Sequence, residues 1–88
     1  MRILAKGSSM YPTMKDGSLY NIEPIDVQHI QTGDIIAYLV EDMVICHRII
    51  HVISTRNGKM FFKTQGDNCV EPDPYAITED MLIGKILL

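Results

Sequence analysis

The chain has 88 residues, a length that predicts a single domain over residues 1–88 with a modest hydrophobic core. Apolar residues make up 47% and charged residues 22%, the composition of an ordinary globular protein, which excludes a disordered or low-complexity chain. The net charge of −3, with lysines and arginines scattered singly, argues against nucleic acid as a partner, because phosphate binding requires a basic surface.

Short runs of β-branched and aromatic residues, separated by turn signals, predict a mostly β chain. We expect six strands, over residues 2–6, 18–25, 34–40, 43–54, 59–65 and 81–88. Residues 27–33 are expected to form a turn or loop, and the one helix candidate is short, from Thr78 to Leu82, with Thr78 at its N-cap. A polar loop from Gly66 to Pro74 follows the fifth strand. Such short strands favour a small coiled sheet or partly open β-barrel.

The dipeptide Asn57-Gly58 lies between the fourth and fifth expected strands. Asn-Gly is the strongest short signal for a β-hairpin, because a type I′ turn requires positive φ at both central residues. We therefore expect a tight hairpin with a type I′ turn at this point.

The fourth strand is the longest and carries two of the three histidines. Its alternate residues place His47 and His51 on one face among apolar side chains, and the opposite face is also largely apolar, so we expect the strand to be well covered. The two imidazoles would lie about 13 Å apart along a strand, too far to share a metal ion. A helical zinc motif is disfavoured, because Arg48 stands where the catalytic glutamate would follow the first histidine.

The two cysteines, Cys46 and Cys69, have neither CxxC nor zinc-ligand spacing, and they are interpreted as buried thiols rather than a disulfide. No apolar run approaches the ~18 residues of a membrane span, and the first residues are too short for a signal peptide. We expect a soluble chain, or the soluble part of something larger.

The segment "GSSMYPTMKDG", residues 7–17, gathers two serines and two glycines close to the start. A serine nucleophile needs a base, a group that orients the base, and backbone donors in a sharp turn, which glycine permits and Pro12 stiffens. His47 is the candidate base. The candidate acids are Asp67, Glu71 and Asp73. On residue types alone, a solvated turn explains the same segment.

The order of five segments adds to this hypothesis. "GSSMYPTMKDG", "GDIIAY", "VICHRIIHV", "FKTQGDNCVEPD" and "IGKIL" together resemble the successive sequence boxes of type I signal peptidases, within the S24/S26 serine peptidases. The resemblance spans nearly the whole chain, and its first and fourth segments are quite specific. It implies a coiled β structure of the LexA/signal peptidase-like type, in agreement with the strand pattern, and no cofactor or metal.

Carried over by position, the resemblance implies that Ser9 is the nucleophile. His47, directly before Arg48, is similar to the histidine of the endoplasmic-reticulum, archaeal and sporulation-type branch, where other bacterial members have lysine. An aspartate completes the site in that branch: Asp73 matches the usual position, and Asp67 is the second candidate. The backbone N–H of Ser9 would bind the oxyanion, and the supporting residues would be Ser8, Met10, Pro12 and Arg48.

The sequence departs from that pattern in three places. The family carries a membrane anchor, usually ahead of the nucleophile, whereas Ser9 comes almost at once here. We expect either a separate soluble peptidase or a chain whose anchor was lost, cut away or supplied by a membrane-anchored partner. In the second case the chain would be membrane-associated. Gly7 stands where the histidine branch often has a serine, and Cys69 and Val70 follow the "GDN" segment.

Three functions remain open at this point. The first is a serine endopeptidase that removes leader or signal segments from a peptide or preprotein bound as an extended strand. The second is a self-cleaving S24-type regulator, which would require a DNA-binding domain and a cleavable linker ahead of the nucleophile, and usually a lysine base. The third is a non-catalytic module of the same fold that binds peptides or a partner. The substrate, the oligomeric state and the location in the cell are not predicted.

Overall fold

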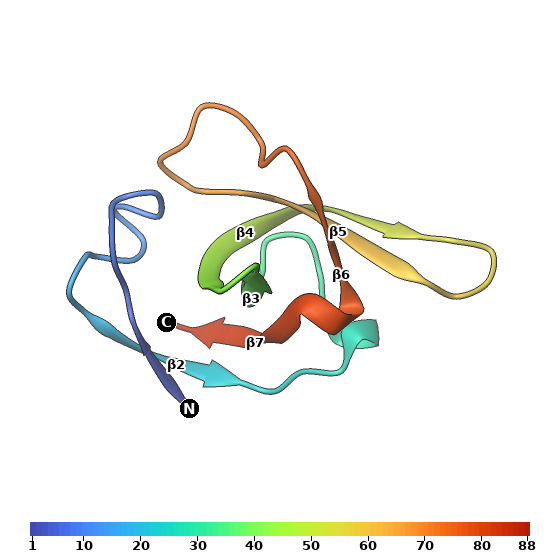
Figure 1. Ribbon diagram of the computed structural model, residues 1–88, viewed down its shortest axis with the longest axis horizontal. Coiled ribbons are helices and arrows are strands. Elements are labelled where there is room, and N and C mark those ends of the chain that lie inside the picture. The colour runs from blue at the N-terminus through green and yellow to red at the C-terminus, as the bar shows by residue number, and fades with distance from the viewer.

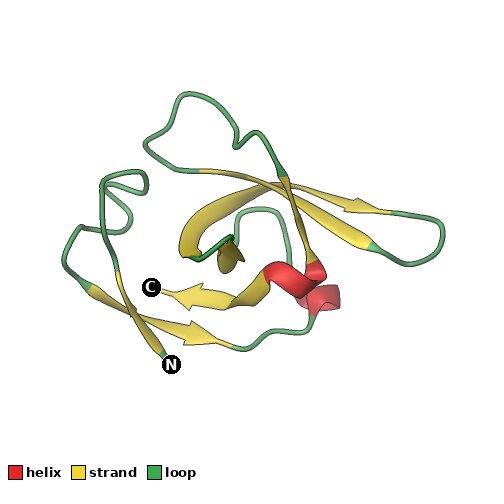
Figure 2. Cartoon of the chain, in the orientation of Figure 1, coloured by secondary structure: helices red, strands yellow, loops and turns green.

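The computed structural model describes residues 1–88 and is a single seven-stranded antiparallel sheet, strongly bent (Figures 1 and 2). The strand order is β1-β2-β7-β3-β4-β5-β6. The strands are β1 (Arg2–Leu4), β2 (Leu19–Glu23), β3 (Ile35–Val40), β4 (Met43–Ser54), β5 (Met60–Gln65), β6 (Ala76–Thr78) and β7 (Leu82–Leu87). The mostly β prediction is confirmed.

The structure has one strand more than the sequence predicted. β6 is only three residues long and lies between the expected polar loop and the helix candidate, which it overlaps only at Thr78. It is fixed by pairing with β5, where Phe62 lies opposite Ile77 and both side chains are fully buried. A strand this short has too little periodicity to be visible in the sequence, so its tertiary partner defines it.

The two helices are single 3-10 turns, η1 (Val27–His29) and η2 (Glu79–Met81). η1 falls where a turn or loop was expected, and η2 falls within the predicted helix from Thr78 to Leu82. Neither is long or apolar enough to cross a membrane.

The β4–β5 hairpin forms where Asn57-Gly58 predicted it, but its turn is not type I′. Only Gly58 has positive φ, at 84°, and Asn57 does not. The backbone N–H of Gly58 donates to the Thr55 carbonyl, and Thr55 and Lys59 close the turn. This is a three-residue loop with glycine in the left-handed position, the next most common hairpin connection.

β4 changes partners halfway along its length. Residues 43–48 pair with β3 and residues 48–54 pair with β5, with an irregularity between Ile49 and His51. The expectation that both faces are well covered is wrong toward the ends of the strand, where Met43 and Ile53 are exposed. A sheet that bends sharply leaves such ends uncovered, while His47 and Ile49 at the centre are buried.

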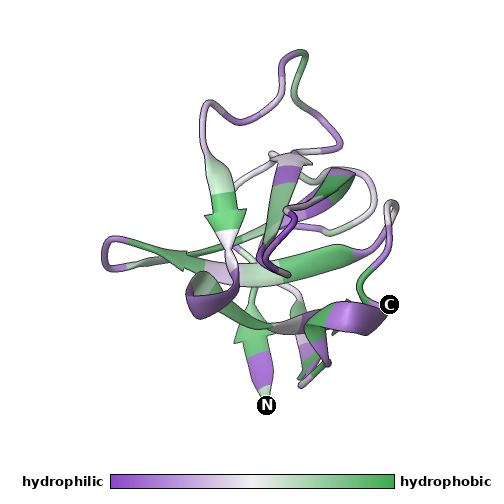
Figure 3. Cartoon of the chain, turned by 90° about the vertical axis from the view of Figure 1, so that its right-hand side faces the viewer, coloured by the Kyte–Doolittle hydropathy of each residue, from purple (hydrophilic) through white to green (hydrophobic).

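The bent sheet holds two hydrophobic cores. One lies around β2, β7 and the loop after β1, and consists of Met10, Met14, Ile22, Ile35, Ala37 and Ile86. The other lies where β3, β4, β5 and β6 meet, and consists of Ile30, Ile36, Tyr38, Ile49, Phe62 and Ile77. Apolar residues run along the strands, and hydrophilic ones gather in loops and turns (Figure 3). The alternate residues of β3 divide between the cores: Ile35 and Ala37 face one, Ile36 and Tyr38 the other.

Candidate active site

Ser9 lies in the loop between β1 and β2, and two kinds of contact fix that loop. Met10 and Met14 are buried in the first core, so the loop is anchored directly after Ser9. Gly7 adopts φ of 85°, and its N–H donates to the carboxylate of Asp16 at 2.8 Å. Ser9 itself remains exposed between these anchors.

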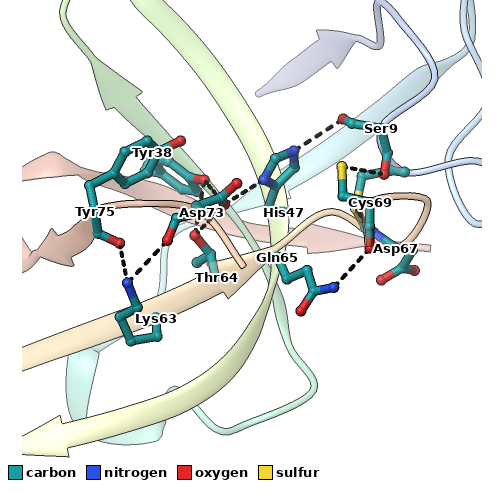
Figure 4. Close-up of polar contacts among 11 residues, drawn as sticks. Ser9, Tyr38, His47, Lys63, Thr64, Gln65, Asp67, Cys69, Asp73 and Tyr75 are labelled. Atoms are coloured by element: carbon teal, nitrogen blue, oxygen red, sulfur yellow. Dashed lines mark hydrogen bonds and ion pairs between the residues drawn. The ribbon is translucent and has the colours of Figure 1, made fainter. Parts of the chain in front are cut away.

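The imidazole of His47 connects Ser9 to Asp73 (Figure 4). Its Nε2 lies 3.1 Å from Ser9 Oγ, and its Nδ1 lies 2.6 Å from Asp73 Oδ2. An ionised carboxylate can only accept, so Nδ1–H donates to Asp73 and the neutral ring presents its Nε2 lone pair to the serine hydroxyl. His47 is only 8% exposed, which limits competition from water for these contacts. The arrangement can remove a proton from Ser9.

Asp73 comes from the loop between β5 and β6, and β5 holds it in place. Its N–H donates to the carbonyl of Thr64 at 2.9 Å, and its Oδ2 accepts from Thr64 Oγ1 at 2.7 Å. Tyr38 OH also donates to Oδ2 at 3.2 Å. Lys63 Nζ donates to the carbonyls of Asp73 and Tyr75. Both the backbone and the side chain of Asp73 are therefore fixed against the imidazole.

Asp67, the second candidate acid, lies at the other end of the same loop and has a different partner. Arg48 donates to it through Nε and Nη2, both at 2.8 Å, and Thr13 Oγ1 donates at 2.6 Å. The hydrogen bonds from Arg48, before any other cause, hold the pKa of Asp67 below its usual value, and the same contact raises the pKa of Arg48. Asp67 makes no hydrogen bond with His47. The third candidate, Glu71, is exposed and also makes none.

Arg48 joins three segments through this ion pair. Its Nη1 donates to the carbonyl of Gly33 at 2.7 Å, while its other nitrogens bind Asp67. Asp67 in turn accepts from Thr13 in the serine loop. Arg48 thus ties these segments together, and its side chain makes no hydrogen bond with Ser9 or Asp73.

The residues after β5 hold the Ser9 backbone, a role that the sequence did not predict. Asn68 N–H donates to the Ser9 carbonyl at 2.8 Å, and its side-chain amide donates to the Ser8 carbonyl at 3.0 Å. Gly66 is packed so closely that a Cβ there would lie 2.6 Å from the Ser9 carbonyl oxygen and 3.2 Å from His47 Nε2. Only glycine fits at that position without displacing the serine loop.

The other three predicted support residues differ in burial: Met10 is buried, whereas Ser8 and Pro12 are exposed. Met10 is a core anchor, and its sulfur accepts from Asp67 N–H. Ser8 is exposed and contributes its carbonyl, and Pro12 is exposed after a cis peptide bond from Tyr11. The backbone N–H groups of Ser9 and Met10 donate to no acceptor within the protein.

Both cysteines are free thiols and only partly buried, rather than fully buried as expected. Burial raises the pKa of the Cys46 thiol to about 11. Cys69 lies beside the site: its N–H donates to the Gly66 carbonyl, and its sulfur is 4.0 Å from the Ser9 carbonyl oxygen.

An apolar cleft of about 620 Å³ ends at Ser9 and His47. One wall of the cleft is formed by β1 and the loop that follows it, and the other wall by the first half of β4. The lining residues are Ile3, Leu4, Ala5, Lys6, Gly7, Ser9, Met10, Met14, Met43, Val44, Ile45, Cys46 and His47. β1 pairs only with β2, and residues 43–47 of β4 pair only with β3. Each of the two strands that border the cleft therefore has one unpaired edge.

Comparison with known proteins gives two matches. The family described as Peptidase S24-like matches residues 2–87. Signal peptidase I W of Bacillus subtilis (strain 168) is 32% identical over 74 residues, which cover 82% of this chain and 38% of that protein. The chain thus spans well under half the length of this relative. No solved structure matches the chain significantly.

Proposed function

We propose that this chain, which belongs to the peptidase S24-like family, is a serine endopeptidase that cleaves leader or signal segments from extended peptides. The observation that carries the proposal is the continuous hydrogen-bonded chain from Ser9 Oγ through both nitrogens of His47 to Asp73 Oδ2. Three segments far apart in the sequence meet in the geometry of a nucleophile, a base and an orienting acid.

In the proposed mechanism His47 Nε2 takes the proton of Ser9 as Oγ attacks the scissile carbonyl. Asp73 stabilises the imidazolium that forms and keeps Nδ1 protonated. The backbone N–H of Ser9 donates to the developing oxyanion, and this N–H has no competing acceptor within the protein. His47 then returns the proton to the leaving amine. A water molecule next attacks the acyl-enzyme with His47 again as base, which releases the second product and restores Ser9.

The cleft supports an extended peptide as the substrate. The unpaired edges of β1 and of residues 43–47 in β4 can bind a peptide backbone by strand addition, while the apolar lining receives its side chains. Leader or signal segments are proposed as the source of such peptides because the relative from B. subtilis is a signal peptidase. We also propose a membrane-anchored partner as an additional requirement for preprotein substrates.

The test uses purified wild-type protein, Ser9→Ala and His47→Gln with a pool of leader-type peptides between pH 6 and 9, with products identified by mass spectrometry. We expect cleavage by the wild type alone, rising through the pH range in which histidine loses its proton. His51→Gln is the matched control, because His51 lies on the same strand but is exposed and makes no side-chain hydrogen bond.

The outcomes separate the proposal from its alternatives. Peptide binding without cleavage by a folded wild type contradicts the endopeptidase and favours a non-catalytic binding module. Cleavage that appears only when a membrane fraction is added supports the anchored partner. Cleavage that persists in Ser9→Ala excludes Ser9 as the nucleophile.

A further inference from the structure

The carboxylate of Asp73 is bound by two hydroxyl groups that the reaction described above does not use. Thr64 Oγ1 lies 2.7 Å and Tyr38 OH lies 3.2 Å from the same oxygen, Oδ2, that accepts from His47. The two hydroxyls also lie 3.2 Å from each other. Both residues are fully buried, Thr64 on β5 and Tyr38 on β3, so strands on either side of β4 hold them.

The proton positions in this cluster follow from the chemistry of its members. The carboxylate only accepts, so Thr64 donates its single hydroxyl proton to Oδ2 and keeps a lone pair. Tyr38 donates its hydroxyl proton to Oδ2, with the Thr64 oxygen at the same distance of 3.2 Å. Burial, before any other cause, raises the pKa of Tyr38, so its phenol keeps its proton and remains a donor. Both hydroxyls therefore favour one position of Oδ2, the position in which it also accepts from Nδ1 of His47.

Thr64 also holds the backbone of Asp73, because its carbonyl accepts the Asp73 N–H at 2.9 Å. The same residue thus fixes both the main chain and the carboxylate. Tyr38 is itself fixed by an edge-to-face contact with Tyr75, at a ring separation of 6.3 Å. None of these three side chains forms a hydrogen bond with Ser9 or lines the cleft.

We propose that Thr64 and Tyr38 are positioning residues, which hold Oδ2 of Asp73 on Nδ1 of His47 and so determine how effectively His47 acts as a base. This inference rests on the proposed function, and it assigns a catalytic consequence to two buried hydroxyls on neighbouring strands. Thr64 has the larger effect, because its hydrogen bond to Oδ2 is shorter and it also binds the backbone.

The first test measures peptide cleavage by Thr64→Val, Thr64→Ser and Tyr38→Phe. Thr64→Val keeps the shape of the side chain but loses the hydroxyl, and we expect kcat to fall about 10- to 100-fold with KM unchanged. Thr64→Ser keeps the donor and is expected to stay within about 3-fold of wild type, and Tyr38→Phe to lose about 3- to 10-fold. Circular dichroism and thermal melting establish that each variant is folded.

The second test needs no turnover and uses the Ser9→Ala protein. Nuclear magnetic resonance records the Nδ1 proton of His47, which a 2.6 Å bond to a carboxylate shifts strongly downfield. We expect Thr64→Val to move this signal upfield or broaden it, and Thr64→Ser to preserve it. If wild type proves inactive while the signal still depends on the Thr64 hydroxyl, the peptidase proposal fails and the positioning role stands.

Two results would overturn the inference. One is a folded Thr64→Val with wild-type kcat and an unchanged Nδ1 proton signal. The other is a Thr64→Ser protein that loses as much activity as Thr64→Val, since packing of the methyl group would then explain the effect. If Thr64→Val does not fold, Tyr38→Phe decides: unchanged kcat and an unchanged signal in that variant also overturn the inference.

Discussion

Two aspartates, six positions apart on one loop, lie in opposite surroundings. Asp67 faces a guanidinium and the hydroxyl of Thr13 near the surface, and its charge is neutralised by Arg48. Asp73 faces an imidazole and two buried hydroxyls, with no arginine or lysine side chain bonded to its carboxylate. A carboxylate that is neutralised by arginine fixes structure, whereas one whose only basic partner is an imidazole remains free to stabilise a charge that forms during a reaction.

The comparison of the two aspartates predicts that Asp73→Asn causes the largest loss of kcat. An amide at this position cannot stabilise the imidazolium and favours the wrong tautomer of His47, so kcat is expected to fall on the order of 10³- to 10⁴-fold. Peptide cleavage under single-turnover conditions measures the loss. Asp67→Asn is the paired control, and an equal loss of kcat in a folded Asp67→Asn protein would contradict the division of roles.

Gly66→Ala is expected to have the next largest effect, because this position packs directly against the Ser9 carbonyl and the His47 imidazole. The new Cβ would lie 2.6 Å from the Ser9 carbonyl, which is backbone and must move. A displacement near 1 Å at a nucleophile costs about 100-fold in rate. Asn68→Ala serves as a milder comparison, since it removes only the side-chain bond to the Ser8 carbonyl. Wild-type kcat in Gly66→Ala would show that the serine loop adjusts without cost.

Asp67→Asn is expected to act mainly on stability. Water reaches both partners of the ion pair, with side-chain exposures of 33% for Arg48 and 18% for Asp67. Screening limits such a pair to about 1 kcal/mol of unfolding free energy. Urea denaturation at pH 7 measures the difference. Arg48→Lys is the matched variant, because lysine keeps the charge but cannot form the two-point contact with Asp67. No loss of stability in either variant would show that the pair contributes nothing measurable.

The smallest expected effect is the pH dependence of the difference in unfolding free energy between wild type and Asp67→Asn. Arg48 depresses the pKa of folded Asp67 below its ordinary value of 3.8, so the folded state favours the ionised form. The stabilisation is fully present above the ordinary pKa and is lost as pH falls through the lower pKa of the folded protein. The stabilities of wild type and Asp67→Asn should therefore converge below about pH 4. A difference that stays constant down to pH 2 would exclude this linkage.

The sequence predicted the strands with strong periodicity and the hairpin at Asn57-Gly58. The family resemblance selected Ser9, His47 and Asp73 as a candidate site, and the fold brings these three side chains into contact. The type of turn and the exposed ends of β4 were not predictable, because both depend on how the sheet bends. The choice between Asp67 and Asp73 also required the fold, since spacing along a loop does not say which carboxylate reaches an imidazole. Thr64 and Tyr38 gave no signal, because a buried hydroxyl in a strand resembles any other strand residue until its neighbour is known.

The place of β7 in the sheet has a consequence for the timing of protein synthesis. The β1–β2 hairpin, which carries Ser9, joins the rest of the sheet only through β7, the last strand in chain order. A nascent chain therefore contains Ser9, His47 and Asp73 before it contains the strand that joins the β1–β2 hairpin to the rest of the sheet. We expect the contact between Ser9 and His47 to become stable only once β7 has left the ribosome.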